Sequence, residues 1–119
     1  MAKLLVIDDE PNVLYSLQTS LQSDELTVIT ADSGQAGIDA ARREQPSAVV
    51  LDMRLPDMSG LEVYEKLRAL EPRVPVIFVT AYTTTETAIE AMRRGAFDYL
   101  LKPYDLHQLR TVLAQALEV

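Results

Sequence analysis

The sequence predicts an α/β domain in which five strands and five helices alternate and form one doubly wound parallel sheet. Three observations lead to this prediction. Short apolar runs of strand length recur along the chain, segments with helical periodicity separate them, and polar residues follow the runs. Repeated strand–helix units build a parallel sheet with helices on its faces. We expect residues 1–119 to form a single domain.

The first half of the chain supplies three of the expected strands and two of the helices. Residues 3–8 form an apolar run, and Pro11 suits the first turn of the helix that follows, where its missing N–H is not needed. The apolar residues of that helix recur at a period near 3.6. The run at 48–51 is apolar throughout, which is typical of a strand buried on both faces. In this half we expect strands near 3–8, 26–31 and 48–53 and helices near 11–22 and 35–44.

The second half continues the alternation. Gly60 and Gly95 stand where one helix is expected to begin and another to end. The run at 76–79 and the shorter run at 99–101 are strand candidates, and the last segment again has a helical apolar stripe. Here we expect strands near 75–80 and 98–101 and helices near 60–70, 86–94 and 106–117.

Composition excludes several classes of protein. The 119 residues are 48% hydrophobic and 24% charged, which is ordinary for a globular domain with one core. A net charge of −7 argues against direct binding to a nucleic-acid backbone. Without cysteine there is no disulfide or thiolate metal site, and this fits a cytoplasmic protein. No apolar run is long enough to span a membrane, and the N-terminus does not resemble a signal peptide.

Polar residues follow four of the apolar runs. Asp8 and Asp9 follow the first, Asp52 follows the run at 48–51, and Thr80 and Lys102 follow the last two. Open parallel sheets bind ligands at the carboxyl ends of their strands. If these strands are neighbours, three acids, a hydroxyl and an ammonium group meet at one edge.

Three carboxylates in one pocket require a cation. Two like charges about 4 Å apart repel by roughly 4 kcal/mol at an effective dielectric constant near 20. Oxygen ligands from loop ends suit Mg²⁺, which uses one or two carboxylates and retains several waters. In an alternative interpretation, Asp8 and Asp9 cap the helix that begins at Pro11. Both interpretations hold if one acid caps and the other binds the metal.

Lys102 and Thr80 also have two interpretations. A lone lysine is usually a solvated surface charge, and threonine is a common strand residue. Lys102 precedes Pro103 at the end of a strand, in a loop where a cis peptide bond is possible. There its ammonium group can neutralise acids or bind a phosphoryl oxygen, and the Thr80 hydroxyl can donate to the same group. His107, the single histidine, is expected on the surface, which excludes a histidine-cluster metal site.

The polar strand ends belong to longer motifs. Read together and in order, they resemble the receiver domain of two-component response regulators, and most closely receivers of the NtrC type. The resemblance implies a flavodoxin- or CheY-like (βα)5 fold with strand order 2-1-3-4-5. The matching segments are Val6-Ile7-Asp8-Asp9-Glu10-Pro11, Val50-Leu51-Asp52-Met53-Arg54-Leu55-Pro56-Asp57-Met58-Ser59-Gly60, Val79-Thr80-Ala81-Tyr82 and Gly95-Ala96-Phe97-Asp98-Tyr99-Leu100-Leu101-Lys102-Pro103.

The resemblance implies a role for each matching residue. Asp52 is the phosphoacceptor, and Thr80 and Lys102 contact its phosphoryl group. Tyr99 is an aromatic switch that responds to Thr80, although it can also simply pack beside Phe97. The implied Mg²⁺ ligands are Asp9, Asp52 and the backbone carbonyl of Arg54, together with Asp8, which acts either directly or through a bound water. Arg54 and Tyr82, each two positions after a site residue, are expected to tune the phosphoryl lifetime.

The resemblance also implies partners. The phosphoryl donor is a sensor histidine kinase, and the surface that changes shape lies around helix four, strand five and helix five. The same surface is a possible homodimer interface. A longer parent chain of the NtrC type would continue into an AAA+ ATPase and a DNA-binding domain, so that the output is transcription. The domain catalyses its own phosphorylation and dephosphorylation, but we expect a signalling module rather than an enzyme.

Three other interpretations compete with this one. A Mg²⁺-dependent aspartyl hydrolase of the haloacid dehalogenase type needs a second Asp two residues after its nucleophile, where this chain has Arg54. A flavodoxin-like cofactor binder needs a phosphate loop after the first strand, where Asp8 and Asp9 would repel the phosphate. A receiver-like domain that is never phosphorylated has the same fold, and only an assay separates it from a working receiver.

Overall fold

The computed structural model describes residues 2–81 and 85–118, in which strands and helices alternate as predicted. The strands are β1 (Ala2–Ile7), β2 (Leu26–Ala31), β3 (Ala48–Asp52), β4 (Val76–Thr80) and β5 (Asp98–Leu101). The helices are α1 (Pro11–Leu21), α2 (Gly34–Glu44), α3 (Gly60–Leu70), α4 (Thr85–Arg93) and α5 (Leu106–Leu117). None of the helices in the described ranges is long and apolar enough to cross a lipid bilayer.

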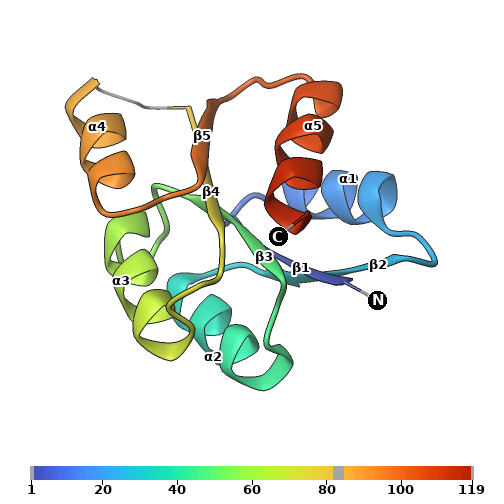
Figure 1. Cartoon of the computed structure of the whole chain (residues 1–119), viewed down its shortest axis with the longest axis horizontal. Coiled ribbons are helices and arrows are strands. Elements are labelled where there is room, and N and C mark those ends of the chain that lie inside the picture. Colours follow the sequence, from blue (N-terminus) through green and yellow to red (C-terminus); the bar gives the residue numbers. More distant parts are fainter. Residues whose placement is uncertain (1, 82–84, 119) are drawn as a thin grey trace.

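The strands form one parallel sheet in the order β2-β1-β3-β4-β5, as Figure 1 shows, and this confirms the predicted fold. Every residue of β3 and of β4 is buried. This burial explains why these two strands are continuous apolar runs rather than alternating patterns. The order makes β1 a direct neighbour of β3, and β3 a direct neighbour of β4.

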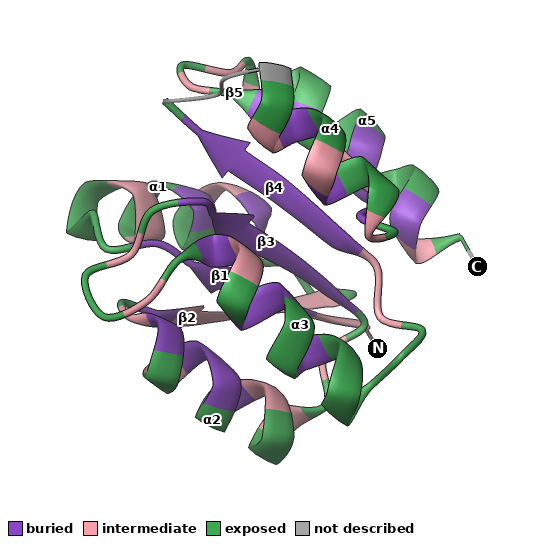
Figure 2. Cartoon of the chain, turned by 90° about the vertical axis from the view of Figure 1, so that its left-hand side faces the viewer, coloured by how far each residue is buried: buried purple, intermediate pink, exposed green. Residues whose placement is uncertain are grey.

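Alternate residues of each strand enter two separate cores, one on each face of the sheet. Leu5 and Ile7 pack with residues of α2, α3 and α4, while Leu4 and Val6 pack with residues of α1 and α5. Figure 2 shows the same division on α2 and α3, which are buried toward the sheet and exposed on the outside. The period of two along the strands therefore builds a three-layer α/β/α domain.

Side chains just before three helices bond to the free N–H groups of the first turn. Ser33 accepts from the N–H of Ala36 at 3.1 Å at the start of α2. Ser59 accepts from Glu62 at the start of α3, and Asp105 accepts from His107 at the start of α5. These bonds satisfy donors that have no partner within the helix. They fix where each helix leaves the loop before it, and two of those loops carry residues of the candidate site.

Candidate functional site

The register of the sheet brings the predicted site residues to one edge. Ile7 pairs with Leu51 across β1 and β3, so Asp8 and Asp52 follow at neighbouring strand ends. Asp52 in turn pairs with Val79 of β4, which places Thr80 one position further along. Parallel strands share one direction, so their carboxyl ends share one edge. The convergence expected from the sequence is present.

Lys102 connects the acids. Its Nζ donates to Asp8 Oδ2 at 2.7 Å and to Asp52 Oδ2 at 3.0 Å, and it lies 3.5 Å from Glu10 Oε1. The side chains of Asp8, Asp52 and Lys102 are only 1%, 8% and 14% exposed. The interpretation of Lys102 as a solvated surface charge is therefore wrong. The ammonium group forms a buried bridge between two carboxylates.

The backbone around Asp52 holds its carboxylate in place. The N–H of Arg54 donates to Asp52 Oδ1 at 3.1 Å, and the N–H of Gly60 donates to the carbonyl of Met53 at 2.7 Å. A Cβ on Gly60 would lie 2.6 Å from the Asp52 carbonyl oxygen and 2.7 Å from Met53 Cα. Only glycine allows the start of α3 to approach the end of β3 this closely.

Burial and charge shift the pKa values at this edge. Burial raises the pKa of Asp52, and the nearby Asp8 charge adds to this, although the Arg54 N–H and Lys102 oppose the shift. Burial by itself would lower the pKa of Lys102, but its bonds to Asp8 and Asp52 outweigh that effect and raise the pKa. Lys102 is therefore charged at neutral pH, and Asp52 ionises less readily than an exposed aspartate.

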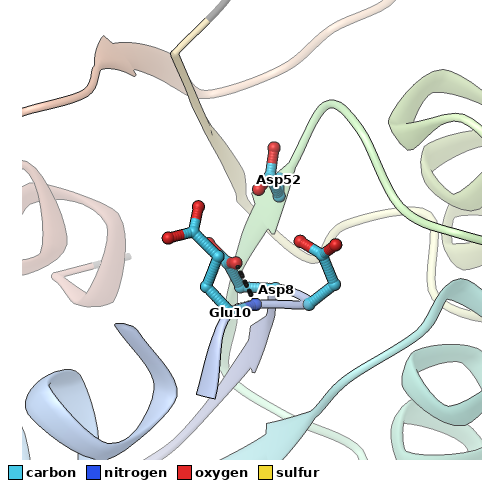
Figure 3. A group of neighbouring side chains, drawn as sticks. Asp8, Glu10 and Asp52 are labelled. Carbon is cyan, nitrogen blue, oxygen red and sulfur yellow. Dashed lines mark hydrogen bonds between the residues drawn. The ribbon is translucent and has the colours of Figure 1, made fainter. Parts of the chain in front are cut away.

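Four carboxylates gather here, as Figure 3 shows for Asp8, Glu10 and Asp52. One oxygen of each of these three acids and of Asp9 lies within 4.8 Å of the others. Lys102 supplies one positive charge beside four acidic groups. The negative charge of the cluster is therefore only partly balanced, and a divalent cation can balance more of it. Hard carboxylate oxygens at this spacing fit the donor set that Mg²⁺ prefers.

Glu10 is the member of this cluster that the sequence analysis missed. It precedes Pro11 at the start of α1, and its carboxylate lies beside the Lys102 ammonium group. The signal that points to it is the unbroken acidic run at 8–10. The run does not predict that the third acid turns back toward the site, because that depends on where α1 begins.

The predicted capping of α1 by Asp8 or Asp9 is wrong. The residue at the N-cap position is Glu10, and its side chain makes no capping bond. Asp8 Oδ1 instead accepts from the N–H of Glu10 at 2.9 Å, before the helix starts. The Asp8 side chain that accepts this bond is itself buried beneath the loop between β1 and α1. Asp9 is exposed beside it.

Thr80 and Tyr99 lie on one face of the sheet. Tyr99 pairs with Phe78, and Thr80 lies two positions after Phe78, so the three side chains project from the same face. Thr80 is 1% exposed, whereas Tyr99 is 37% exposed. Phe97 packs against the core on the other face, which does not support the alternative of simple packing between Phe97 and Tyr99. Tyr82 lies outside the described residues.

The loop after β5 completes the site. The peptide bond between Lys102 and Pro103 is cis, and the N–H of Lys102 donates to the Thr80 carbonyl at 2.9 Å. His107 is exposed in the first turn of α5, as expected. A surface cavity of about 690 Å³ lies beside Tyr64 and Arg73, at the opposite edge of the sheet, and is lined by none of the predicted site residues.

Comparisons with known proteins agree with this geometry. The family model described as response regulator receiver domain matches residues 4–114. The regulatory protein AtoC of Escherichia coli (strain K12) is 38% identical over 117 residues, which are 98% of this chain and 25% of AtoC. AtoC and several further relatives are NtrC-type regulators, and this confirms the expected subtype.

Solved structures give the same assignment. A receiver domain protein from Clostridium thermocellum superposes with a TM-score of 0.93 at 32% identity, over 99% of this chain and 95% of that one. NtrX from Brucella abortus, crystallised with ATP, gives a TM-score of 0.90 at 30% identity, over 98% of this chain and 27% of its own. The chain thus spans about a quarter of AtoC and of NtrX. Receiver domains are signalling modules, and the relatives are regulators rather than metabolic enzymes. The chain belongs to the response regulator receiver domain family.

Proposed function

We propose that this domain accepts a phosphoryl group on Asp52 from a sensor histidine kinase and changes its surface in response. The observation that carries the proposal is the buried Asp52 carboxylate, which lies 3.0 Å from the Lys102 ammonium group beside an acidic cluster. A stable fold alone does not require this arrangement, since buried ion pairs are expensive to desolvate. The presence of this buried ion pair is consistent with a chemical role.

The residues at this edge fit Mg²⁺. Asp8, Asp9, Asp52 and the backbone carbonyl of Arg54 are the proposed ligands, and the donor set is oxygen throughout. When bound, Mg²⁺ supplies positive charge that offsets the negative charge on the phosphoryl oxygens. Glu10 lies in the same cluster and adds to its negative potential.

The protein's own groups carry out the transfer. A carboxylate oxygen of Asp52 attacks phosphorus, the phosphorus–oxygen bond forms, and the phosphorus–nitrogen bond of the kinase phosphohistidine breaks. The imidazole leaves with the bonding electron pair. Positioning and charge stabilisation dominate such transfers, because the transition state is loose. Lys102, which bridges Asp8 and Asp52 beforehand, can exchange a carboxylate for a phosphoryl oxygen without moving far.

The proposed switch uses Thr80 and Tyr99. A phosphoryl group on Asp52 attracts the Thr80 hydroxyl, because phosphate adds charge and acceptor oxygens. Movement of Thr80 frees space on the face that it shares with Tyr99, and the half-exposed ring moves inward. A ligand shifts such an equilibrium only by its difference in affinity for the two states. Charge-assisted hydrogen bonds of about 1.5–3 kcal/mol are large enough to do this.

The proposed partners follow from the surface and from the relatives. α4 and β5 expose four large hydrophobic side chains near the proposed switch, which supports a weak homodimer contact there: Ile89, Met92, Tyr99 and Leu101. Because the chain spans only a quarter of its NtrC-type relatives, we propose that the output is made by further domains, an AAA+ ATPase and a DNA-binding domain. The receiver itself is proposed to bind neither nucleic acid nor membrane.

Incubation with acetyl phosphate and Mg²⁺, followed by intact-mass measurement, tests this function. We expect the gain of one phosphoryl group. Asp52→Asn and omission of Mg²⁺ should each abolish it. No gain in the wild type, with a control receiver phosphorylated in parallel, would instead point to a receiver-like domain that is never phosphorylated or to a domain that needs its kinase.

A further inference from the structure

The loop from β3 to α3, residues 53–59, leads from Asp52 and is paired at its base. The N–H of Gly60 donates to the Met53 carbonyl at 2.7 Å, and Arg54 and Ser59 form an antiparallel bridge. Residues 55–58 form the short tip of the loop, between the two paired positions. Contacts made by the tip therefore affect the position of the Arg54 backbone.

Asp57 binds the tip to the start of α2. Its Oδ1 accepts from the N–H of Gly34 at 2.8 Å, and its Oδ2 accepts from the N–H of Gln35 at 2.9 Å. These N–H groups belong to the first turn of α2 and have no acceptor within the helix. A negative charge is favoured there by the helix dipole. The carboxylate thus spans two donors with both of its oxygens.

A second contact joins the same two segments. A Cβ on Gly34 would lie 2.5 Å from Met58 Cγ, so the Met58 side chain rests directly on the backbone at the start of α2. Met58 is half-buried, as is Leu55 at the other end of the tip. The loop tip is therefore bound by two hydrogen bonds and packed on both sides of them.

Asp57 is not needed to cap α2. Ser33 already does so, because its hydroxyl accepts from the N–H of Ala36 at 3.1 Å. Gly34 and Gln35 carry the donors that Ser33 leaves free. Both Ser33 and Asp57 accept hydrogen bonds at the start of α2. Ser33 lies directly before the helix, so its bond affects α2 alone. Asp57 lies in the loop that follows Asp52, so its bonds also fix the position of that loop.

We propose that Asp57 is a positioning residue for the phosphoacceptor site. By fixing the loop tip, it orients the backbone of Arg54, whose N–H donates to Asp52 Oδ1 at 3.1 Å and whose carbonyl is a proposed Mg²⁺ ligand. This inference rests on the proposed function. Groups that orient a metal ligand without touching the metal change its affinity by about 10- to 100-fold in other proteins.

The test compares Asp57→Ala, Asp57→Asn and Ser33→Ala in the otherwise unchanged chain. Mg²⁺ affinity is measured by titration calorimetry with MgCl₂, without any phosphoryl donor. We expect Asp57→Ala to weaken it about tenfold. The Mg²⁺ affinity of Asp57→Asn should lie between those of the wild type and Asp57→Ala, because an amide oxygen can still accept from one N–H. Ser33→Ala removes a bond at the same helix start but should leave Mg²⁺ affinity unchanged.

Two further readouts separate positioning from simple loss of stability. Phosphorylation of Asp57→Ala by acetyl phosphate should need about tenfold more Mg²⁺ for half its maximal rate, yet reach the wild-type rate at saturation. In protein without Mg²⁺, the amide protons of Arg54 and Ser59 should exchange faster in Asp57→Ala and not in Ser33→Ala.

Unchanged Mg²⁺ affinity in a folded Asp57→Ala protein would overturn the positioning role. So would an equal loss in Ser33→Ala, which would assign the effect to α2. A wild-type protein that neither binds Mg²⁺ nor becomes phosphorylated would overturn the proposed function itself. This failure can be told apart from a failure of the positioning role, because it is seen in the wild-type protein alone.

Discussion

The ammonium nitrogen of Lys102 lies 3.0 Å from Oδ2 of Asp52, a residue fifty positions earlier in the chain. Both side chains are largely buried, and the same ammonium group also binds Asp8 at 2.7 Å. The bridge prepares the site in two ways. It keeps a lysine charged beside the proposed nucleophile, and it partly balances a cluster that would otherwise be strongly repulsive.

Replacing Lys102 by methionine should destabilise the domain at neutral pH. The substitution leaves Asp8 and Asp52 buried without their cation, and breaking a buried pair costs about 3–5 kcal/mol. The pKa of Asp52 is already raised by burial. Ionising Asp52 in the folded protein therefore lowers the free energy of unfolding as pH rises above the ordinary pKa of an aspartate. Removing Lys102 raises that pKa further. Urea denaturation should therefore show a larger loss at pH 7.5 than at pH 5.

The opposite pH dependence would contradict this picture of the bridge. Added Mg²⁺ should restore part of the lost stability, since the metal supplies the missing positive charge. Lys3→Met, which removes a half-exposed surface pair with Glu44, is the matched control. It should change stability by less than about 1 kcal/mol.

Asp57 should stabilise the domain more when it is ionised than when it is protonated. The N–H groups of Gln35 and Gly34 hold its pKa below the ordinary value of 3.8. A lowered pKa means that the contribution is fully present above 3.8 and is lost as pH falls through the folded-state pKa. The melting temperatures of wild type and Asp57→Asn should differ at pH 6 and converge at the most acidic pH where both remain folded. A constant difference would show that charge is not involved.

Gly60→Ala should damage the site more than Gly34→Ala does. At Gly60 the added methyl group meets the backbone of Asp52 and Met53, which cannot move without shifting the end of β3. At Gly34 it meets side-chain atoms of Met58 and Val63, so the Met58 contact that helps to hold the loop tip must shift, but the backbone at the end of β3 need not move. We expect Gly60→Ala to cost about 1–3 kcal/mol and to slow phosphorylation sharply. Equal phosphorylation rates in the two variants would contradict the close approach.

Gln45→Gly should stabilise the domain. Gln45 ends α2 with φ of 50°, a left-handed conformation that glycine adopts without strain. The expected gain is about 0.5–1 kcal/mol, after the greater flexibility of glycine in the unfolded chain is subtracted. Urea denaturation measures it directly. Gln22→Gly is the contrasting variant. Gln22 ends α1 with φ of −67°, and its Oε1 accepts from the N–H of Val28 at 3.2 Å, so this substitution should lower stability.

The fold could be predicted from the sequence because each strand is a compact apolar run. β3 was expected at 48–53 and is found at Ala48–Asp52. β4 starts at Val76 rather than 75, because Pro75 has no N–H to donate and only its carbonyl joins the sheet, accepting from Val49 at 3.0 Å. Differences of one residue at the ends are normal for such boundaries.

The site was predictable to the extent that sheet geometry decides it. Three of the site residues lie at the ends of strands or directly after them, namely Asp8, Asp52 and Lys102. The carboxyl ends of parallel strands lie at one edge of the sheet, independent of the conformation of the loops. Glu10 and Asp57 depend on the loops instead. Placing Glu10 needs the exact start of α1, and placing Asp57 needs the distance between one loop tip and the start of α2. Neither is encoded in a local pattern of residues.

The central claim is that Asp52 carries the phosphoryl group, and reductive trapping tests it most directly. The protein is treated with acetyl phosphate and Mg²⁺, and borohydride then reduces any aspartyl phosphate to homoserine. Peptide mass spectrometry should find homoserine at position 52 and at no other aspartate, and the product should be absent when acetyl phosphate is omitted. Homoserine at position 8, 9 or 57, or a phosphorylated protein without homoserine, would contradict the assignment of Asp52.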